Sequence, residues 1–170
     1  WHGCRKISAG CKNCYVYVID LAHGRNPTNV FKTQAFNLPV KKNRQGEYKY
    51  HQEGYVYTCL TSDFFIEEAD EWREDAWQIM RTRSDLQFYI ITKRIHRFMD
   101  CLPADWGDGY PNVTIGCTIE NQQLADERLP ILHECPIQHK QLVCEPLLSD
   151  IDFGPYIEDI EGIIVGGETG

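Results

Sequence analysis

Residues 55–91 read YVYTCLTSDFFIEEADEWREDAWQIMRTRSDLQFYII, and this stretch decides the fold class. Its two ends, 55–60 and 86–91, are rich in aromatic and β-branched residues, which predicts two buried strands. Between them, apolar residues recur every three or four positions and predict a helix over 67–83. A strand, a helix and a second strand in this order form a right-handed parallel crossover. The sequence therefore predicts a parallel α/β fold.

The rest of the chain repeats this alternation. Further strands are predicted at 113–119, 141–144 and 162–165. Helical segments are predicted at 94–101, 121–134 and 155–159. Asn121 is a suitable cap for the second of these, and Pro130 is expected to kink or shorten it. The strands are apolar almost throughout, as in a sheet buried on both faces, and both a barrel and an open doubly wound sheet fit this pattern.

The region before residue 55 is less regular. A helix is predicted over 14–23. The segment 25–54 is rich in polar residues, Gly, Pro and Asn, and is expected to form an excursion on the surface of a single domain, 1–170. The chain opens on Trp1 rather than methionine and stops just after a strand, so we expect it to be truncated at both ends.

The distribution of charge restricts the kinds of partner. A net charge of −8 argues against a surface that grips nucleic acid everywhere. Basic residues cluster locally in the excursion, at Lys32, Lys41, Lys42 and Arg44. This cluster leaves open a nucleic-acid contact confined to one lobe, with an ordinary solvated loop as the alternative.

The eight cysteines fall into groups with different expected roles. The chain has no secretory signal and no membrane-spanning run, so we expect a reducing, cytoplasmic setting in which close cysteines bind metal more often than they form disulfides. Cys59, Cys117 and Cys144 lie within apolar runs, where a thiol packs as a small apolar group.

Three other cysteines form a compact loop at the start of the chain: Cys4, Cys11 and Cys14. Three thiolates suit an iron–sulfur cluster or zinc. Zinc would need a fourth ligand, for which His2 is near enough in sequence. A further alternative is that these thiols are unrelated, with one pair acting as a redox dithiol.

Polar residues follow each predicted strand at its carboxyl end, where the active sites of parallel α/β domains form. They are Thr61-Ser62-Asp63, Thr92-Lys93-Arg94, Glu120-Asn121, Glu145-Pro146 and Gly166-Gly167-Glu168-Thr169. The glycine pair would let the backbone approach a ligand, and the carboxylate beside it would receive an amine or a ribose hydroxyl. Alternatively, Asp63 and Asn121 cap helices. In that case Lys93 and Arg94 would pair with Glu120.

Several runs of the sequence together resemble the phage "gene product 37 / gene product 68" family, a domain of unknown function: WHGCRKISAGCKNCYVY, YTCLTSDFF, EADEWREDAW, FYIITKR, NVTIGCTIEN, CEPLL and IIVGGETG. The resemblance covers essentially the whole chain. That family in turn looks like a divergent relative of the radical S-adenosylmethionine enzymes. The resemblance implies a partial (β/α)6 TIM-barrel-like domain with parallel strands and a three-cysteine loop that holds a [4Fe–4S] cluster.

The resemblance also implies roles for single residues. The three cysteines would ligate three irons, Tyr15 would flank the cluster, and the free iron would bind the amino and carboxylate groups of S-adenosylmethionine. Two features depart from that superfamily. The first cysteine gap is six residues instead of three. Gly166-Gly167-Glu168 follow a late strand rather than the second strand, where Ser62 and Asp63 stand instead.

These inferences predict an iron–sulfur enzyme of phage or bacterial origin that acts on an unknown substrate, with nucleic acid or a nucleotide as a candidate. The expected catalytic residues are Lys93, Glu120 and Glu145. The expected cofactor-binding residues are Tyr15, Ser62, Asp63, Arg94, Asn121, Gly166, Gly167 and Glu168. The alternative is a zinc-stabilised, non-catalytic module that binds nucleic acid or a protein partner. A third hypothesis, a metal-free hydrolase using Asp63 and Glu145, lacks a marked nucleophile.

Overall fold

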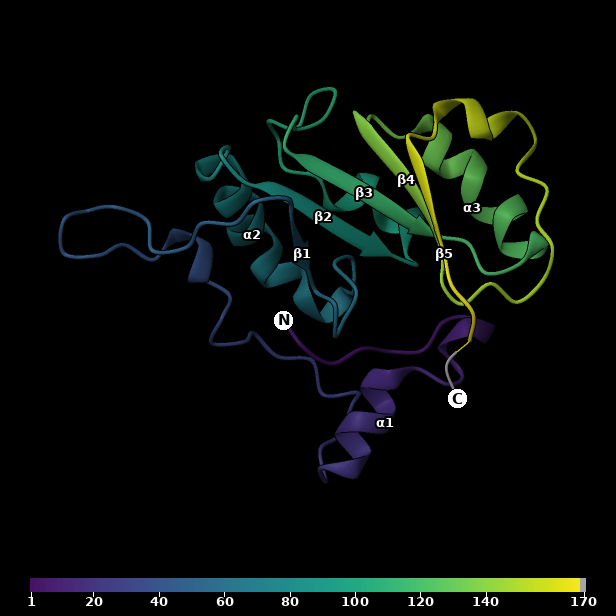
Figure 1. Ribbon diagram of the computed structural model, residues 1–170, viewed down its shortest axis with the longest axis horizontal. Helices are drawn as coiled ribbons and strands as arrows, with labels where there is room; N and C mark the ends of the chain where they lie inside the picture. The colour runs from purple at the N-terminus through teal and green to yellow at the C-terminus, as the bar shows by residue number, and fades with distance from the viewer. Residues whose placement is uncertain (169–170) are drawn as a thin grey trace.

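A five-stranded sheet forms the centre of the computed structural model, which describes residues 1–168. The strands are β1 (Tyr55–Thr58), β2 (Gln87–Thr92), β3 (Val113–Thr118), β4 (His139–Cys144) and β5 (Gly162–Val165). Every neighbouring pair is parallel, and the order in the sheet follows the order in the chain (Figure 1). The predicted parallel α/β fold is therefore confirmed.

The edges of the sheet decide between the two architectures that the sequence left open. Within residues 1–168, β1 and β5 are the two edges and do not pair with each other, so the sheet is not closed into a barrel. A doubly wound sheet reverses its strand order at a switch point, and this sheet has no such reversal. The sheet is open and wound in one direction.

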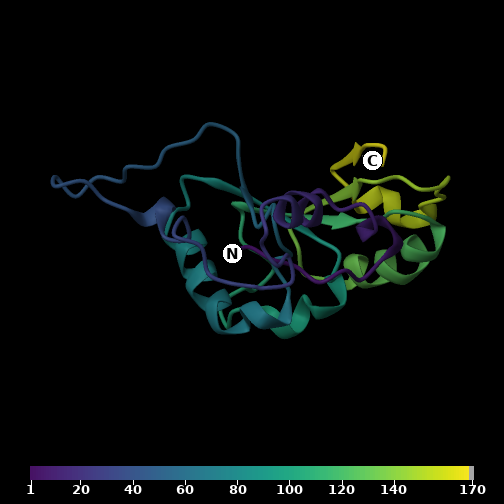
Figure 2. The same cartoon turned by 90° about the horizontal axis from the view of Figure 1, so that it is seen from below.

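Two helices, α2 (Asp70–Thr82) and α3 (Gln122–Glu134), pack on the same face of the sheet (Figure 2). The strand pleat sends every second side chain to this face. Trp77 of α2, Leu129 of α3 and Ile115 of β3 belong to one apolar core and are each no more than 2 % exposed. Burial of these side chains holds the sheet and helices together and leaves the carboxyl ends of the strands to the loops.

Two helical predictions differ from the structure. The segment 94–101 forms two short 3₁₀ turns, Ile95–Arg97 and Met99–Cys101, instead of one α-helix. Its buried apolar residues recur at every third position, at Ile95, Phe98 and Cys101. That interval matches the three residues per turn of a 3₁₀ helix better than the 3.6 of an α-helix. In α3, Pro130 does not shorten the helix, which continues to Glu134.

The first 54 residues contain one α-helix, α1 (Tyr15–Ala22), and otherwise run as loops and short 3₁₀ turns. The residues before α1 run past the lower ends of the strands in Figure 1, and α1 projects beyond them. The predicted excursion 25–54 includes a hairpin in which Lys42 pairs with Tyr48, and this hairpin extends away from the sheet and helices in both views (Figures 1 and 2). None of the described helices combines the length and the apolar character needed to cross a membrane.

Candidate functional site

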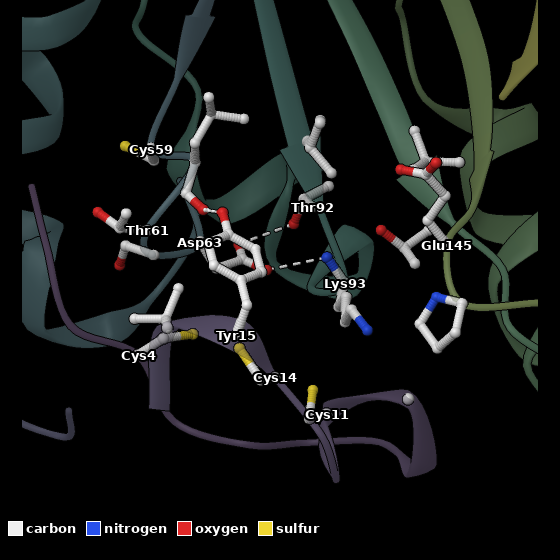
Figure 3. Close-up of a pocket in the computed structure, with 18 of the residues that line it drawn as sticks. Cys4, Cys11, Cys14, Tyr15, Cys59, Thr61, Asp63, Thr92, Lys93 and Glu145 are labelled. Atoms are coloured by element: carbon white, nitrogen blue, oxygen red, sulfur yellow. Dashed lines mark hydrogen bonds between the residues drawn. The ribbon is translucent and has the colours of Figure 1, made fainter. Parts of the chain in front are cut away.

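A cavity of about 390 Å³ lies at the carboxyl ends of the strands, between them and residues 1–24, which we call the cysteine segment (Figure 3). Its size is in the range of small-molecule and cofactor sites. Most of the predicted site residues line it: Cys4, Cys11, Cys14, Tyr15, Ser62, Asp63, Lys93, Arg94, Glu145, Gly167 and Glu168. Four predicted residues do not line it: His2, Glu120, Asn121 and Gly166. Thr169 lies outside the described residues.

The cysteine segment is fastened to the end of β1 at Gly3. Its backbone N–H donates to the carbonyl of Thr61 at 3.1 Å, and the Ser62 hydroxyl donates to the Gly3 carbonyl. Gly3 has φ +88°, and a Cβ there would lie 2.1 Å from the carbonyl oxygen of Asn29, so only glycine fits. Ser62, predicted to bind cofactor, therefore also places the cysteine segment.

Asp63 and Arg94 connect the strand ends to Cys4. Asp63 is 4 % exposed and accepts hydrogen bonds from the Thr92 hydroxyl and the Lys93 backbone N–H, both at 2.8 Å. Arg94 lies 3.3 Å from the second Asp63 oxygen and reaches the Cys4 sulfur at 3.9 Å. Asp63 therefore acts as a brace. Its side chain also accepts a hydrogen bond from the Phe65 backbone N–H at 3.0 Å, but the next helical turn begins only at Glu67, so Asp63 is not a helix cap.

The pKa values of Cys4 and Cys11 are shifted in opposite directions. Burial raises the pKa of Cys4 to about 11, despite the nearby Arg94 guanidinium. Burial also disfavours the Cys11 thiolate, but hydrogen bonds, first of all from Ser8, outweigh it and lower the pKa of Cys11. The Ser8 oxygen and the Cys11 sulfur are 3.5 Å apart. The loop therefore presents thiols with distinct reactivities.

Tyr15 closes one side of the cavity as the first residue of α1, directly after Cys14. Its hydroxyl donates to the carbonyl of Leu60 across the cavity (Figure 3). Burial, together with the charge of Cys14, raises the pKa of Tyr15, so the phenol stays protonated at neutral pH. Tyr15 lies beside the cysteines, where the sequence prediction put it.

His2 is engaged elsewhere. Its Nε2 lies 2.7 Å from Oδ2 of Asp20, and its ring lies 5.4 Å from that of Phe31. Asp20 is 1 % exposed and also pairs with Arg25, so the histidine serves a buried carboxylate. Within residues 1–168, no three His, Cys, Asp or Glu side chains converge closely enough to hold a single metal ion. His2 therefore contacts Asp20 in this structure and does not line the cavity with the three cysteines.

Glu120 lies beneath the cysteine segment rather than in the cavity. It is fully buried, and one of its oxygens accepts hydrogen bonds from the Lys93 ammonium and from the Ser8 hydroxyl, the latter at 2.9 Å. A Cβ at Gly10 would lie 2.5 Å from that oxygen, so the loop sits directly on the carboxylate. In this structure Glu120 therefore positions Lys93 and the cysteine loop, its second oxygen has no hydrogen-bond partner among the described residues, and its catalytic role stays a prediction.

Two other predicted residues also have structural roles. Asn121 caps α3, where its side chain accepts a hydrogen bond from the Leu124 backbone N–H at 3.0 Å. Gly166 lies against Glu145, and a Cβ there would be 2.5 Å from a Glu145 carboxylate oxygen. Glu145 itself is exposed, lines the cavity and makes no ion pair among the described residues. Of the two predicted catalytic carboxylates, Glu145 is the one that a ligand in the cavity could contact.

The sequence predictions missed several lining residues, among them Thr118 and Cys59. Thr118 is 1 % exposed, and its hydroxyl has no hydrogen-bond partner in the described chain. Cys59 also lines the cavity, although its sulfur points away from the other labelled cysteines in Figure 3, and burial raises its pKa to about 12. Their positions could have identified both, because Thr118 ends β3 and Cys59 directly follows β1, at the carboxyl ends of the strands where ligands bind in parallel α/β domains.

Comparison with known proteins places the chain in a family. No curated protein and no solved structure matches it. A family model described as "Protein of unknown function (DUF5131)" matches residues 1–170. The match includes the cysteine segment, all five strands and the loops that line the cavity. The protein therefore belongs to the DUF5131 family.

Proposed function

We propose that the cavity holds an iron–sulfur cluster with S-adenosylmethionine, and that the protein is an enzyme similar to the radical S-adenosylmethionine enzymes. The observation that carries the proposal is that Cys4, Cys11 and Cys14 line one cavity, opposite the ionisable residues of the strand ends. Zinc needs its ligands gathered around one point, whereas the cysteines of a cluster each bind a different iron. Three thiols that line one cavity could each bind one iron of a cluster.

The arrangement of the sheet supports the same proposal. Its five strands are parallel, follow chain order and carry α2 and α3 on one face, as the wall of a barrel does. A ligand in such a fold binds at the carboxyl ends of the strands, and the cavity lies there. A partial barrel is the architecture that the resemblance to the radical S-adenosylmethionine enzymes implies.

The buried Thr118 hydroxyl, which has no hydrogen-bond partner in the described chain, indicates whether the cavity suits a polar ligand. A buried hydroxyl without a partner is costly, and such atoms in native proteins usually meet a ligand, an ion or water. Glu145, also in the cavity, would bind a cationic group such as an amine. The residues present therefore fit a cofactor that carries an amine and hydroxyls.

The cluster, once reduced, would supply the electron that cleaves the cofactor's sulfonium and starts hydrogen abstraction from the substrate. The chain's own residues would prepare the site. Arg94 places a positive charge beside Cys4 and offsets thiolate charge there. Lys93, fixed by Glu120, would hold an anionic group of cofactor or substrate. Tyr15 shields one side of the cavity from water.

Anaerobic purification followed by iron and sulfide analysis tests the proposal. We expect brown protein with about four iron and four sulfide per chain if a [4Fe–4S] cluster is bound. Cys14→Ala should lose most of this iron. Cys135→Ala is the matched control, because Cys135 is 5 % exposed and does not line the cavity, and it should keep the iron.

Two outcomes would count against the proposal. Colourless protein with one tightly bound zinc would support the zinc-stabilised binding module instead. Iron retained at the wild-type ratio in Cys14→Ala would show that the cysteine segment does not hold the cluster.

A further inference from the structure

The hairpin 41–49 carries a net positive charge, and its cationic side chains form no ion pairs with the described residues. It contains Lys41, Lys42, Arg44 and Lys49 against one acid, Glu47, a net charge of +3 in a chain of −8. All four cationic residues are exposed. None of them pairs with a carboxylate among residues 1–168, whereas Arg25 and Lys32, just before the hairpin, pair with Asp20 and Asp75.

The hairpin is an ordered structure. The Asn43 side-chain oxygen accepts hydrogen bonds from the backbone N–H groups of Gln45 and Glu47, at 2.9 and 3.0 Å, and so shapes the turn. The two arms are joined by a hydrogen bond from the Lys49 N–H to the Lys41 carbonyl at 2.8 Å. The charged side chains are therefore presented on a defined two-stranded ribbon.

Arg83 holds both sides of the hairpin's base. This arginine follows α2 and is completely buried. It donates to the carbonyls of Pro39 and Tyr50, which flank the hairpin, and its guanidinium carbon lies 4.2 Å from the centre of the Tyr48 ring. Asp85 neutralises it, with Oδ2 2.7 Å from Nη2. The clamp fixes the ribbon to the body while its tip extends away (Figures 1 and 2).

We propose that the hairpin 41–49 binds duplex DNA through its phosphate backbone. Unpaired, exposed lysine and arginine side chains are the groups that displace counterions from phosphates. The major groove of B-form DNA is wide enough for a two-stranded ribbon, so a protruding hairpin can place cations against both of its phosphate walls. The acidic remainder of the chain repels DNA and confines the contact to the hairpin. This inference does not depend on the cluster proposed above.

The number of cations predicts the salt dependence. Four phosphate contacts give a slope of about −3.6 in log affinity against log salt concentration, because each contact contributes about −0.9. Raising the salt from about 50 to about 200 mM should then weaken binding roughly a hundredfold. Neutralising two of the four cations should reduce the slope by about two.

The test is fluorescence anisotropy of a labelled 20-base-pair DNA duplex with anaerobically purified protein over a range of salt concentrations. The variant Lys42→Gln/Arg44→Gln is compared with the control Arg25→Gln/Lys32→Gln, which changes the net charge equally outside the hairpin. We expect the hairpin variant to bind at least about tenfold more weakly at 50 mM salt, with the lower slope. The control should bind DNA as the wild type does, and circular dichroism melting should show both variants folded.

Three results would overturn the proposal. One is no measurable DNA binding by the wild type at 50 mM salt. Another is an equal loss of affinity in both double variants, which would indicate a general charge effect. The third is hairpin-dependent binding to vesicles of anionic lipid without binding to DNA, which would assign the hairpin to a membrane surface. The iron content of the same samples reports separately on the cluster, so failure here does not bear on the proposed function.

Discussion

The sheet body, residues 55–168, and the cysteine segment, residues 1–24, enclose the same cavity but are held by different forces. In the body, apolar side chains such as Ile115 and Phe65 are completely buried between the sheet and its helices. The cysteine segment contributes one large side chain to that core, Trp1, which is 7 % exposed and packs on Phe64. After Trp1, the segment is attached mainly through polar contacts of its backbone and of Ser8 with the strand ends. Apolar burial is proportional to area and non-directional, whereas hydrogen bonds are directional.

This difference teaches that stability and site assembly are separable in this protein. The body should set the free energy of unfolding, because most of the buried apolar area lies there. The polar contacts of the segment should set where the cysteine sulfurs lie, with a smaller effect on global stability. Substitutions that act on one region and spare the other can test this separation.

The largest expected effect is on the stability of the body. Ile115→Ala on β3 should lower the free energy of unfolding by about 2–5 kcal/mol, because Ile115 is completely buried and the lost side chain leaves a cavity. Ile163→Ala on β5 is the matched control, since Ile163 is 39 % exposed, and should cost less than about 1 kcal/mol. Urea denaturation of both variants measures the difference. Equal costs would mean that the core does not dominate stability.

An intermediate effect is expected from the contact between loop and sheet. Gly10→Ala would bring a Cβ to 2.5 Å from a Glu120 oxygen and 2.9 Å from Pro146 Cδ. Overpacking of this kind costs about 1–3 kcal/mol, and the loosely attached segment should yield before the sheet does. We therefore expect reduced iron retention and faster alkylation of the cavity thiols, with only a small shift of the unfolding midpoint.

Gly167→Ala is the control for this substitution. Gly167 also lines the cavity, but a Cβ there would meet nothing within 4 Å. Iron content and alkylation rates should match the wild type. If Gly167→Ala lost as much iron as Gly10→Ala, the seating of the loop on Glu120 would not explain the effect.

The body was largely predictable from the sequence because apolar residues recur in its strands and helices at the intervals typical of buried strands and helices. Apolar runs located all five strands, and the stripe from Ala69 to Ile79 located α2. The 3₁₀ turns near Phe98 were missed, although the three-residue interval of buried side chains was present in the sequence. The local periodicity of apolar residues therefore predicted the sheet and its helices. The error arose where the three-residue period of a 3₁₀ helix was interpreted as an α-helix.

The site was predictable only in outline, because polarity at a strand end does not specify what a side chain contacts. Lys93 and Glu145 face the cavity as expected, but Glu120 is covered by the loop that lies on Gly10. His2 is close to the cysteines in sequence, yet its side chain forms a hydrogen bond with the buried Asp20, eighteen residues away. Such tertiary contacts join distant segments, and no local pattern encodes them.

The smallest expected effect distinguishes two thiols within the cysteine segment. In metal-free protein at pH 8, Cys11 should react with iodoacetamide faster than Cys4. The thiolate is the reactive form, and a lowered pKa for Cys11 populates it at a pH where Cys4, with a pKa of about 11, remains protonated. Cys11 therefore holds more thiolate than Cys4 at this pH, and the weaker nucleophilicity of the more acidic thiol offsets that advantage only in part, so the rate ratio should be about tenfold.

Site-resolved mass spectrometry across pH 7 to 9.5 measures both rates, and Ser8→Ala supplies the control. That substitution removes the hydrogen-bonding group 3.5 Å from the Cys11 sulfur, the largest influence that lowers the pKa of Cys11, so this pKa should rise and the gap between the two rates should narrow. A Cys4 rate equal to that of Cys11 in the wild type would contradict the polar attachment of the segment. In that case the segment would be loose in solution and both thiols would behave as free cysteines. A difference between the two alkylation rates that disappears only in Ser8→Ala would instead attribute the acidity of Cys11 to its hydrogen bond with Ser8.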